Sequence, residues 1–285
     1  MKIVSTVSEV REIVKEWKKS GLTIGLVPTM GYLHEGHASL IRRASKENDR
    51  VIVSDFVNPT QFAPTEDLES YPRDIERDAK VCEQEGADVI FHPTTEEMYF
   101  PNATTFVNMT GPSEELCGKS RPIHFRGVCT VVSKLFNIAS PDKAYFGQKD
   151  AQQLAVIKRM VRDLNFDIEI IGCPIVREAD GLARSSRNVY LSKDERQAAL
   201  ILHKALEEGR KMVLCGETSS SVIKKSISDI IESEPLAKID YVEIVSFPDV
   251  EKVEDIDGDI LAAVAVYIGK TRLIDNFITE NGKEI

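Results

Sequence analysis

Long apolar runs, an excess of basic residues and paired cysteines are all missing from this sequence of 285 residues. Because no unbroken apolar run is long enough to cross a bilayer, no membrane partner is expected. Residues 1–9 lack the apolar core of a signal peptide, so the predicted compartment is the cytoplasm. Acidic residues (46) outnumber Lys and Arg (36), which gives a formal charge of −10. Since a broad nucleic-acid interface needs a basic surface, nucleic acid is not an expected partner either.

Disulfide bonds and a zinc site are also not expected. The number of cysteines is odd, no Cys-x-x-Cys motif occurs, and a cytoplasmic chain keeps its thiols reduced. We therefore expect the cysteines to pack as small apolar side chains. No cysteine or further histidine stands at a supporting spacing from the histidine pair described next, which argues against zinc. The sequence shows no internal repeat and no low-complexity tract.

A segment rich in glycine and histidine, residues 28–37 (PTMGYLHEGH), is the strongest functional signal. The apolar run before it, residues 22–27, predicts a buried strand, and residues 38–44 after it have helical spacing. The segment therefore predicts a turn that joins a strand to the start of a helix. A helix start presents unpaired backbone N–H groups and a partial positive charge, which together suit a phosphate group.

Two residue types in this turn fit phosphate binding. Gly31 and Gly36 allow the backbone to approach a ligand where a Cβ atom would obstruct it. His34 and His37 are three residues apart, so on a helical turn they share one face and can reach one anion. A single histidine is more often a surface or core residue. Two of them beside two glycines in a strand–turn–helix favour a binding site.

A second strand–turn–helix unit has a lysine at its turn. The strand is predicted over residues 142–146, the turn is Gly147-Gln148-Lys149-Asp150, and the helix covers residues 151–163. A lysine in a turn is usually a surface residue. Beside a glycine at the carboxyl end of a strand, Lys149 can instead reach an ATP phosphate.

Three further polar segments each allow two interpretations. Residues 58–62 follow a predicted parallel strand over residues 50–57, and they form either a turn or part of a ligand crevice. Residues 121–127 contain two arginines and a histidine before a helix, and they either bind an anion or form a solvated loop. Residues 184–187 place serines between two arginines, after a turn at Asp180-Gly181, and are another anion-binding candidate.

The remaining pattern predicts an α/β protein with two domains, residues 1–180 and 181–285. Strands and helices alternate in the first part, whereas helices and an antiparallel hairpin at Gly269-Lys270 follow in the second. Ser8 is the expected N-cap of the first helix, and Ser192 is the expected N-cap of a later helix, where Glu195 completes a capping box. Helices are expected over residues 9–19, 75–85, 128–139, 193–214 and 220–232, and further strands over residues 88–91, 105–107, 167–172, 239–247, 260–268 and 272–278.

The string Pro-Thr-Met-Gly-Tyr-Leu-His-Glu-Gly-His resembles the signature of the pantothenate synthetase (pantoate–β-alanine ligase) family, in the nucleotidylyltransferase superfamily. Other segments agree with that family in the same order, at residues 55–62, 71–73, 125–128, 146–153 and 185–188. The resemblance implies a Rossmann-like parallel sheet in the N-terminal domain, a smaller α+β C-terminal lid domain, and a homodimer. It also implies ATP-dependent joining of (R)-pantoate and β-alanine through a pantoyl adenylate, with release of AMP and pyrophosphate.

The resemblance further assigns an ATP site, position by position. His34, His37 and Lys149 would be catalytic, with His37 as the proton donor. Mg²⁺ would be held by the ATP phosphates, and no protein ligand is assigned to it. The residues that would bind ATP are Met30, Gly31, Tyr32, Leu33, His34, Glu35, Gly36, His37, Gly147, Gln148, Lys149, Asp150, Val176, Arg184, Ser185, Ser186 and Arg187.

The same resemblance assigns the sites of the two other substrates. Gln61 and Gln153 would hold pantoate, and Gln61 would also meet β-alanine. Asn58 would complete this substrate site. Arg184 stands where the family usually has methionine, so the local shape of the nucleotide site is open at this position.

Two other functions stay open at this point. Another nucleotidylyltransferase would share the histidines and lack the paired glutamines, and it would leave a nucleotide on its product. A nucleotide-binding sensor, which is not an enzyme, would bind ATP through the histidines without releasing pyrophosphate.

Overall fold

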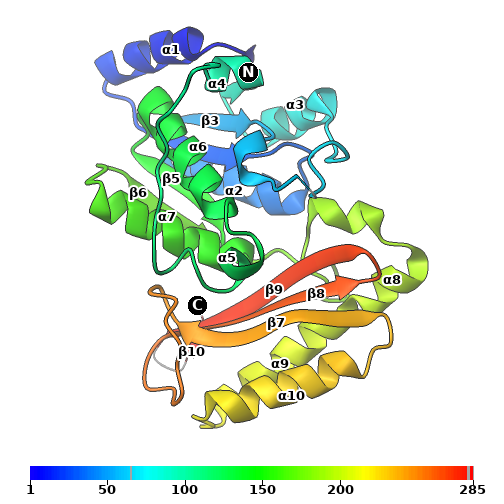
Figure 1. Cartoon of the computed structure of the whole chain (residues 1–285). Helices are drawn as coiled ribbons and strands as arrows, with labels where there is room; N and C mark the ends of the chain where they lie inside the picture. Colours follow the sequence, from blue (N-terminus) through cyan, green and yellow to red (C-terminus); the bar gives the residue numbers. More distant parts are fainter. Residues whose placement is uncertain (65, 281–282, 285) are drawn as a thin grey trace. The chain divides into compact units, whose positions relative to one another are not determined.

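The computed structural model describes residues 1–64, 66–280 and 283–284 of the chain, which form two compact units (Figure 1). Each unit draws on separate segments of the sequence. Unit 1 comprises Met1–Met109, Arg121–Gly147 and Val156–Cys173, and unit 2 comprises Thr110–Ser120, Gln148–Ala155 and Pro174–Ile285. The division at residue 180 into two domains stays a prediction.

Unit 1 is built on a parallel sheet that has six strands over the described residues, in the order β1-β4-β3-β2-β5-β6. The middle of β3 is apolar and fully buried, as in a parallel sheet that is covered on both faces. The α/β class predicted from the sequence is confirmed. The strands are β1 (Lys2–Val4), β2 (Ile24–Thr29), β3 (Arg50–Asp55), β4 (Val89–Phe91), β5 (Lys143–Gly147) and β6 (Glu169–Cys173).

Helices cover both faces of this sheet. One face packs against α2 (Glu35–Glu47) and α3 (Ile75–Gln84), which supply Ile41, Ala44 and Cys82 to a shared apolar core. The helices α1 and α6 contact each other, and α6 also contacts β2. The other helical elements of this part of the chain are α1 (Val7–Lys19), η1 (Pro59–Gln61), α4 (Thr95–Met98), α6 (His124–Ala139) and α7 (Ala151–Asp163), whose first residues fall in the unit 2 range.

The strand order of unit 1 defines where a ligand would bind. Going from β2, the chain first adds strands on one side, β3 and then β4, and later adds β5 and β6 on the other side. Open α/β sheets bind ligands beyond the carboxyl ends of the strands where the order reverses, which here lies between β2 and β5. The segment Met30–His37 follows β2 directly, and Gly147 is the last residue of β5.

Unit 2 is an antiparallel sheet in the order β10-β9-β8-β7, with helices packed on one face. In β8 the side chains alternate: Ile260, Ala262 and Val264 join the core with the helices, and Leu261 and Ala263 join a second core on the opposite face. The predicted hairpin is confirmed, since β8 and β9 pair across Gly269-Lys270. The elements are α5 (Cys117–Ser120), η2 (Gln148–Asp150), η3 (Ser186–Tyr190), α8 (Lys193–Ala198), α9 (Leu200–Leu214), α10 (Ser220–Glu232), β7 (Ala237–Ser246), β8 (Ile260–Ile268), β9 (Thr271–Glu280) and β10 (Lys283–Glu284).

Some local predictions are wrong for identifiable reasons. The N-cap of α1 is Thr6 and not Ser8, because Glu9 accepts the Thr6 N–H at 2.9 Å and so completes a capping box. Residues 105–107, all of them described, form no strand. The single helix expected over residues 193–214 is divided into α8 and α9 at Ala199. The capping box of Ser192 and Glu195 is confirmed.

Among the described residues, no helix combines the length and the apolar character that crossing a membrane would take. Four of the cysteines are buried, as expected for small apolar side chains, but Cys215 at the end of α9 is exposed.

Candidate functional site

The turn after β2 is held by a buried carboxylate. Asp78, on α3, is 1% exposed, and its two oxygens accept the backbone N–H groups of Tyr32 at 2.6 Å and Leu33 at 2.7 Å. Gly31 and Tyr32 both have positive φ angles, of 77° and 51°. A Cβ atom on Gly31 would lie 2.4 Å from the Asp55 carboxylate, so only glycine fits. Asp78 therefore fixes a strained turn immediately before the first residues of α2.

The two histidines cap α2 reciprocally. His34 is the N-cap, and its Nδ1 accepts the Gly36 N–H at 3.1 Å. The Nδ1 of His37 accepts the His34 N–H at 3.3 Å, and the two ring centroids are 4.1 Å apart. Because each Nδ1 accepts a hydrogen bond, each imidazole, when neutral, carries its proton on Nε2. The start of α2 thus combines two oriented imidazole rings with the positive end of the helix dipole, which suits an anion.

The acidic surroundings of this turn shift two pKa values. Burial, opposed in part by the two backbone N–H groups and reinforced by the charge of Asp55, raises the pKa of Asp78 to about 6. Hydrogen bonding to the side chain of Asp55 raises the pKa of His92, whose Nδ1 lies 2.9 Å from the Asp55 carbonyl oxygen. The turn therefore packs against two neighbouring carboxylates, Asp55 and Asp78, with His92 beside them.

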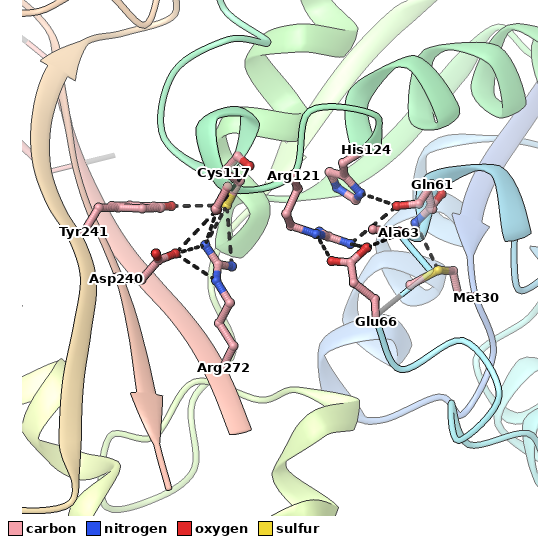
Figure 2. A network of polar contacts seen from close by, with 11 residues as sticks. Met30, Gln61, Ala63, Glu66, Cys117, Arg121, His124, Asp240, Tyr241 and Arg272 are labelled. Carbon is pink, nitrogen blue, oxygen red and sulfur yellow. Dashed lines mark hydrogen bonds and ion pairs between the residues drawn. The ribbon is translucent and has the colours of Figure 1, made fainter. Parts of the chain in front are cut away.

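The η1 segment brings Gln61 to the same end of the sheet. Gln61 is 7% exposed, and its Nε2 lies 3.1 Å from the sulfur of Met30, in the turn after β2 (Figure 2). The amide of Asn58 donates to Gln61 Oε1 at 3.0 Å and so fixes the orientation of that side chain. Gly127 on α6 permits this packing, because a Cβ atom there would lie 2.5 Å from the carbonyl oxygen of Thr60.

Arg121, just before α6, and His124, its first residue, contact this segment, since α6 begins at His124 and not at residue 128 as predicted. His124 Nδ1 lies 3.0 Å from the Gln61 carbonyl oxygen, and Arg121 forms an ion pair with Glu66 (Figure 2). Burial alone would raise the pKa of Glu66, but hydrogen bonds from Arg121 and the Ala63 N–H lower it below its ordinary value. From the sequence, residues 121–127 are expected to bind an anion or to form a solvated loop. The structure instead shows contacts within the protein that support η1.

The lysine turn belongs to unit 2 and is held by β9. Gln148 and Lys149 are half-buried in η2, and the Nδ2 of Asn276 donates to their carbonyl oxygens at 3.1 Å and 2.9 Å. Of the two adjacent glutamines on α7, Gln152 is buried and bonds to the backbone of Cys117, Pro112 and Glu115. Gln153 is half-buried.

The segment from Val176 to Arg187 forms a tight hairpin and a short helix. The Arg184 N–H donates to the Val176 carbonyl oxygen at 2.9 Å, and the predicted turn at Asp180-Gly181 is present, with φ of 99° at Gly181. Ser185 is the N-cap of η3 and accepts the Arg187 N–H at 3.3 Å. The Nε of Arg184 is buried and has no hydrogen-bond partner within the described part of the chain.

The hairpin is tied to β9 by a buried ion pair. The guanidinium of Arg177 donates to both oxygens of Asp275, at 2.7 Å and 3.0 Å. Asp275 is 4% exposed, and the same guanidinium also donates to the Gly181 carbonyl oxygen at 3.1 Å. A bidentate pair of this kind fixes the orientation as well as the position of the arginine.

The predicted site residues therefore fall into two groups. In unit 1 the turn of residues 30–37 lies with Gln61 and Asn58, and Gly147 ends β5. In unit 2, β9 holds both residues 148–150 and the hairpin that begins at Val176.

Sequence reasoning missed three supporting residues. Asp78 stands on the apolar face of α3, between Ile75 and Cys82, and a lone acid at a core position of a helix is a usable signal. Asp275 and Asn276 interrupt the apolar run from Leu273 to Ile278 in β9, which is a similar signal. Within the described ranges, no group of three or more His, Cys, Asp or Glu side chains is arranged to hold a metal ion.

Comparison with known proteins gives matches over almost the whole chain. The sequence model of the Pantoate-beta-alanine ligase family matches residues 2–278. A pantothenate synthetase of Clostridium acetobutylicum is 63% identical over 277 residues, which is 97% of this chain and 99% of that protein.

Solved structures agree. That of pantothenate synthetase from Thermus thermophilus has a TM-score of 0.90 at 44% identity and covers 97% of this chain and 98% of its own. That of pantoate-beta-alanine ligase from Francisella tularensis, complexed with beta-gamma ATP and beta-alanine, has a TM-score of 0.79 at 35% identity, with coverages of 98% and 97%.

Replacing Asp78 by asparagine should change how stability depends on pH. The pKa of Asp78 is raised to about 6, above the value of about 4 in an unfolded chain. Its contribution to stability is therefore fully present below about pH 4 and lost as the pH rises through about 6. From about pH 4.5 to 7.5, wild type should lose about 2 kcal/mol of unfolding free energy relative to Asp78→Asn. Urea titrations of both proteins measure this, and a difference that does not vary with pH would contradict the assignment.

Proposed function

Because the chain belongs to the pantoate–beta-alanine ligase family, we propose that it condenses (R)-pantoate with β-alanine to pantothenate, converting ATP to AMP and pyrophosphate. It is a ligase that forms a carbon–nitrogen bond. The strongest support is the family match over residues 2–278, which favours this reaction over a different nucleotidylyltransferase and over a nucleotide sensor.

The first step would be attack by a carboxylate oxygen of pantoate on the α-phosphorus of ATP. A bond from that oxygen to phosphorus forms, the bond to the pyrophosphate oxygen breaks, and pantoyl adenylate results. Such a step depends on holding two anions in line, and good alignment can contribute about 7–11 kcal/mol. Fixed donors must also meet the charge on the phosphoryl oxygens.

The start of α2 is suited to meet that charge. The Nε2–H groups of His34 and His37 would donate to it from rings whose orientation the caps fix before ATP binds, and the positive end of the α2 dipole would add to them. We assign His37 as the proton donor and His34 as a phosphate contact. We also assign the remaining residues of the turn, Met30 to Gly36, to the ATP site.

The cationic and hydroxyl groups of unit 2 would supply the rest of the nucleotide contacts. Lys149 is assigned to the phosphates as a catalytic cation, with Gly147, Gln148 and Asp150 beside it. The second segment comprises Val176, Arg184, Ser185, Ser186 and Arg187. Arginine can bind phosphate through two parallel N–H donors, and the buried Nε of Arg184 has no partner within the described residues.

The second step would be attack by the amine of β-alanine on the acyl carbon of the adenylate. A carbon–nitrogen bond forms, the bond to the AMP oxygen breaks, and the amine loses a proton. We assign Gln61 to pantoate and β-alanine, Gln153 to pantoate, and Asn58 to the same site through its hold on Gln61. No nucleophile from the protein is needed in either step.

Mg²⁺ would bind together with ATP. Phosphate oxygens and water are ligands that this ion prefers, and no group of three metal-binding side chains lies among the described residues. When bound, the ion would offset the charge of the outer phosphates. The residues of this chain that face the same charge are the histidines and Lys149.

The cytoplasm stays the proposed compartment, because residues 1–9 lack the apolar core of a signal peptide. Two further features are proposed from the family resemblance. Residues 181–285 would act as a lid that keeps water from the adenylate. The chain would form a homodimer, which analytical ultracentrifugation can measure.

The reaction itself can be tested directly with purified protein. With ATP, Mg²⁺, pantoate and β-alanine, we expect pantothenate and AMP in equal amounts by mass spectrometry. Omission of pantoate should abolish both products. Formation of ADP in place of AMP, or a nucleotide attached to the final product, would contradict the proposed reaction.

Loss of His37 or Lys149 should slow adenylation without unfolding the protein. Because His37 is assigned as the proton donor and Lys149 to the charge of the phosphates, we expect His37→Ala and Lys149→Ala each to lower the single-turnover rate of AMP formation by about 10²–10³. Circular dichroism checks that the fold persists. A rate close to that of wild type in either variant would remove that residue from the catalytic set.

Gln61→Ala should chiefly weaken the use of pantoate. Its buried amide lies at the end of the sheet where pantoate is proposed to bind, and loss of such a group costs roughly 1–3 kcal/mol. We expect the KM of pantoate to rise about tenfold or more, with the KM of ATP within about twofold of wild type. If only the KM of ATP rose in steady-state kinetics, the assignment of Gln61 would be wrong.

A further inference from the structure

We propose that Asp275 and Asn276, two consecutive buried residues of β9, are positioning residues that hold both nucleotide-binding segments of unit 2 in their working geometry. The inference rests on the proposed function, because it takes residues 148–150 and 176–187 as parts of the ATP site. It assigns a role in the reaction to a strand from the far C-terminal part of the chain.

Asn276 acts on the lysine turn. Its Nδ2 group carries two protons, and it donates to the carbonyl oxygens of Gln148 and Lys149 at 3.1 Å and 2.9 Å. Asn276 is 4% exposed, and its Oδ1 is buried without a hydrogen-bond partner in the described part of the chain. A side chain that leaves one buried polar atom unpaired is costly in a sheet. The two hydrogen bonds that Asn276 donates to the η2 backbone offset this cost.

Asp275 acts on the second segment. Its carboxylate accepts both terminal nitrogens of Arg177, at 2.7 Å and 3.0 Å, and the N–H of Asn276 at 2.8 Å. Arg177 forms a β-bridge with Ala183, so the side-chain pair anchors the hairpin that leads to Arg184 and Ser185. The backbone bond to the carboxylate fixes the rotamer of Asp275 and links it to its neighbour.

The alternation of a β-strand explains how one strand reaches two segments. Successive side chains point to opposite faces of the sheet. Leu273 and Phe277, on the face of Asp275, belong to the core shared with α9 and α10. Ile278, on the face of Asn276, belongs to the core shared with the start of α7, directly after η2. The two faces of β9 therefore each hold one segment, and the strand sets their relative position within unit 2.

Asn276→Ala tests the positioning of Lys149. The variant removes both donors and leaves the side chain of Lys149 unchanged. A small misplacement of a catalytic group can cost about 10²-fold, so we expect kcat to fall about tenfold to hundredfold. The KM of pantoate should stay within about twofold of wild type, because the transition state is affected and pantoate binding is not. Asp275→Asn is the second variant, and it should mainly raise the KM of ATP.

Two matched controls on the same strand separate positioning from stability. Thr279 is fully buried, and its hydroxyl has no hydrogen-bond partner among the described residues, so Thr279→Val should leave kcat and the melting temperature close to wild type. Leu273 is 5% exposed in the core, and Leu273→Ala should lower the melting temperature without changing kcat. A drop in kcat for Leu273→Ala equal to that for Asn276→Ala would show a merely structural role and overturn the proposal.

A double-mutant cycle tests whether Asn276 acts through Lys149. Adenylation is followed in single turnovers, over long times for the slow variants. In the Lys149→Ala background, Asn276→Ala should have little further effect, because the group that it positions is gone. Fully additive losses would overturn the inference. An active wild type with unchanged kinetics in Asn276→Ala and Asp275→Asn refutes the inference alone, whereas a wild type that makes no pantothenate refutes the proposed function and the inference with it.

Discussion

A buried carboxylate that accepts two backbone N–H groups is the interaction on which the candidate site of unit 1 depends. Asp78 fixes Tyr32 and Leu33 in a turn that glycine at position 31 alone permits, and this turn delivers the chain to the first residue of α2. There the two histidines cap the helix with one ring nitrogen each, so that the orientation of both rings is fixed. The constraint is the general one that buried backbone N–H groups need acceptors.

The same constraint, with the roles of donor and acceptor exchanged, governs unit 2. Here the turn that carries Lys149 exposes carbonyl oxygens to a buried strand, and the amide of Asn276 supplies the donors. Asp275 next to it holds the hairpin before Arg184 through Arg177. In both units, polar residues outside the expected motifs hold the loops that the motifs occupy. Polar residues of this kind lower the stability of a core, and a role in positioning the loops explains why they are present.

Much of the fold could be predicted from the sequence, because hydrophobic periodicity determines which face of each element is buried. The parallel strands, the turn after β2 and the final hairpin were recoverable in this way. The edge strand β1 was not, because three residues that pair only on one side leave almost no pattern. The motif histidines could be named from the sequence. Asp78 and Asn276 stand out there only as polar residues at apolar positions, and their partners could not be named because these lie 45 and 127 residues away in the chain.

Both sets of loops are proposed to serve one chemical event, attack by the pantoate carboxylate on the α-phosphorus of ATP. This event fixes the fate of one atom, because the attacked phosphorus keeps the carboxylate oxygen when the amide forms. The most direct measurement uses pantoate labelled with ¹⁸O at both carboxylate oxygens, together with ATP and β-alanine, and analyses AMP by mass spectrometry. The account predicts one labelled oxygen in each AMP formed. Unlabelled AMP, or label found in inorganic phosphate instead, would contradict it.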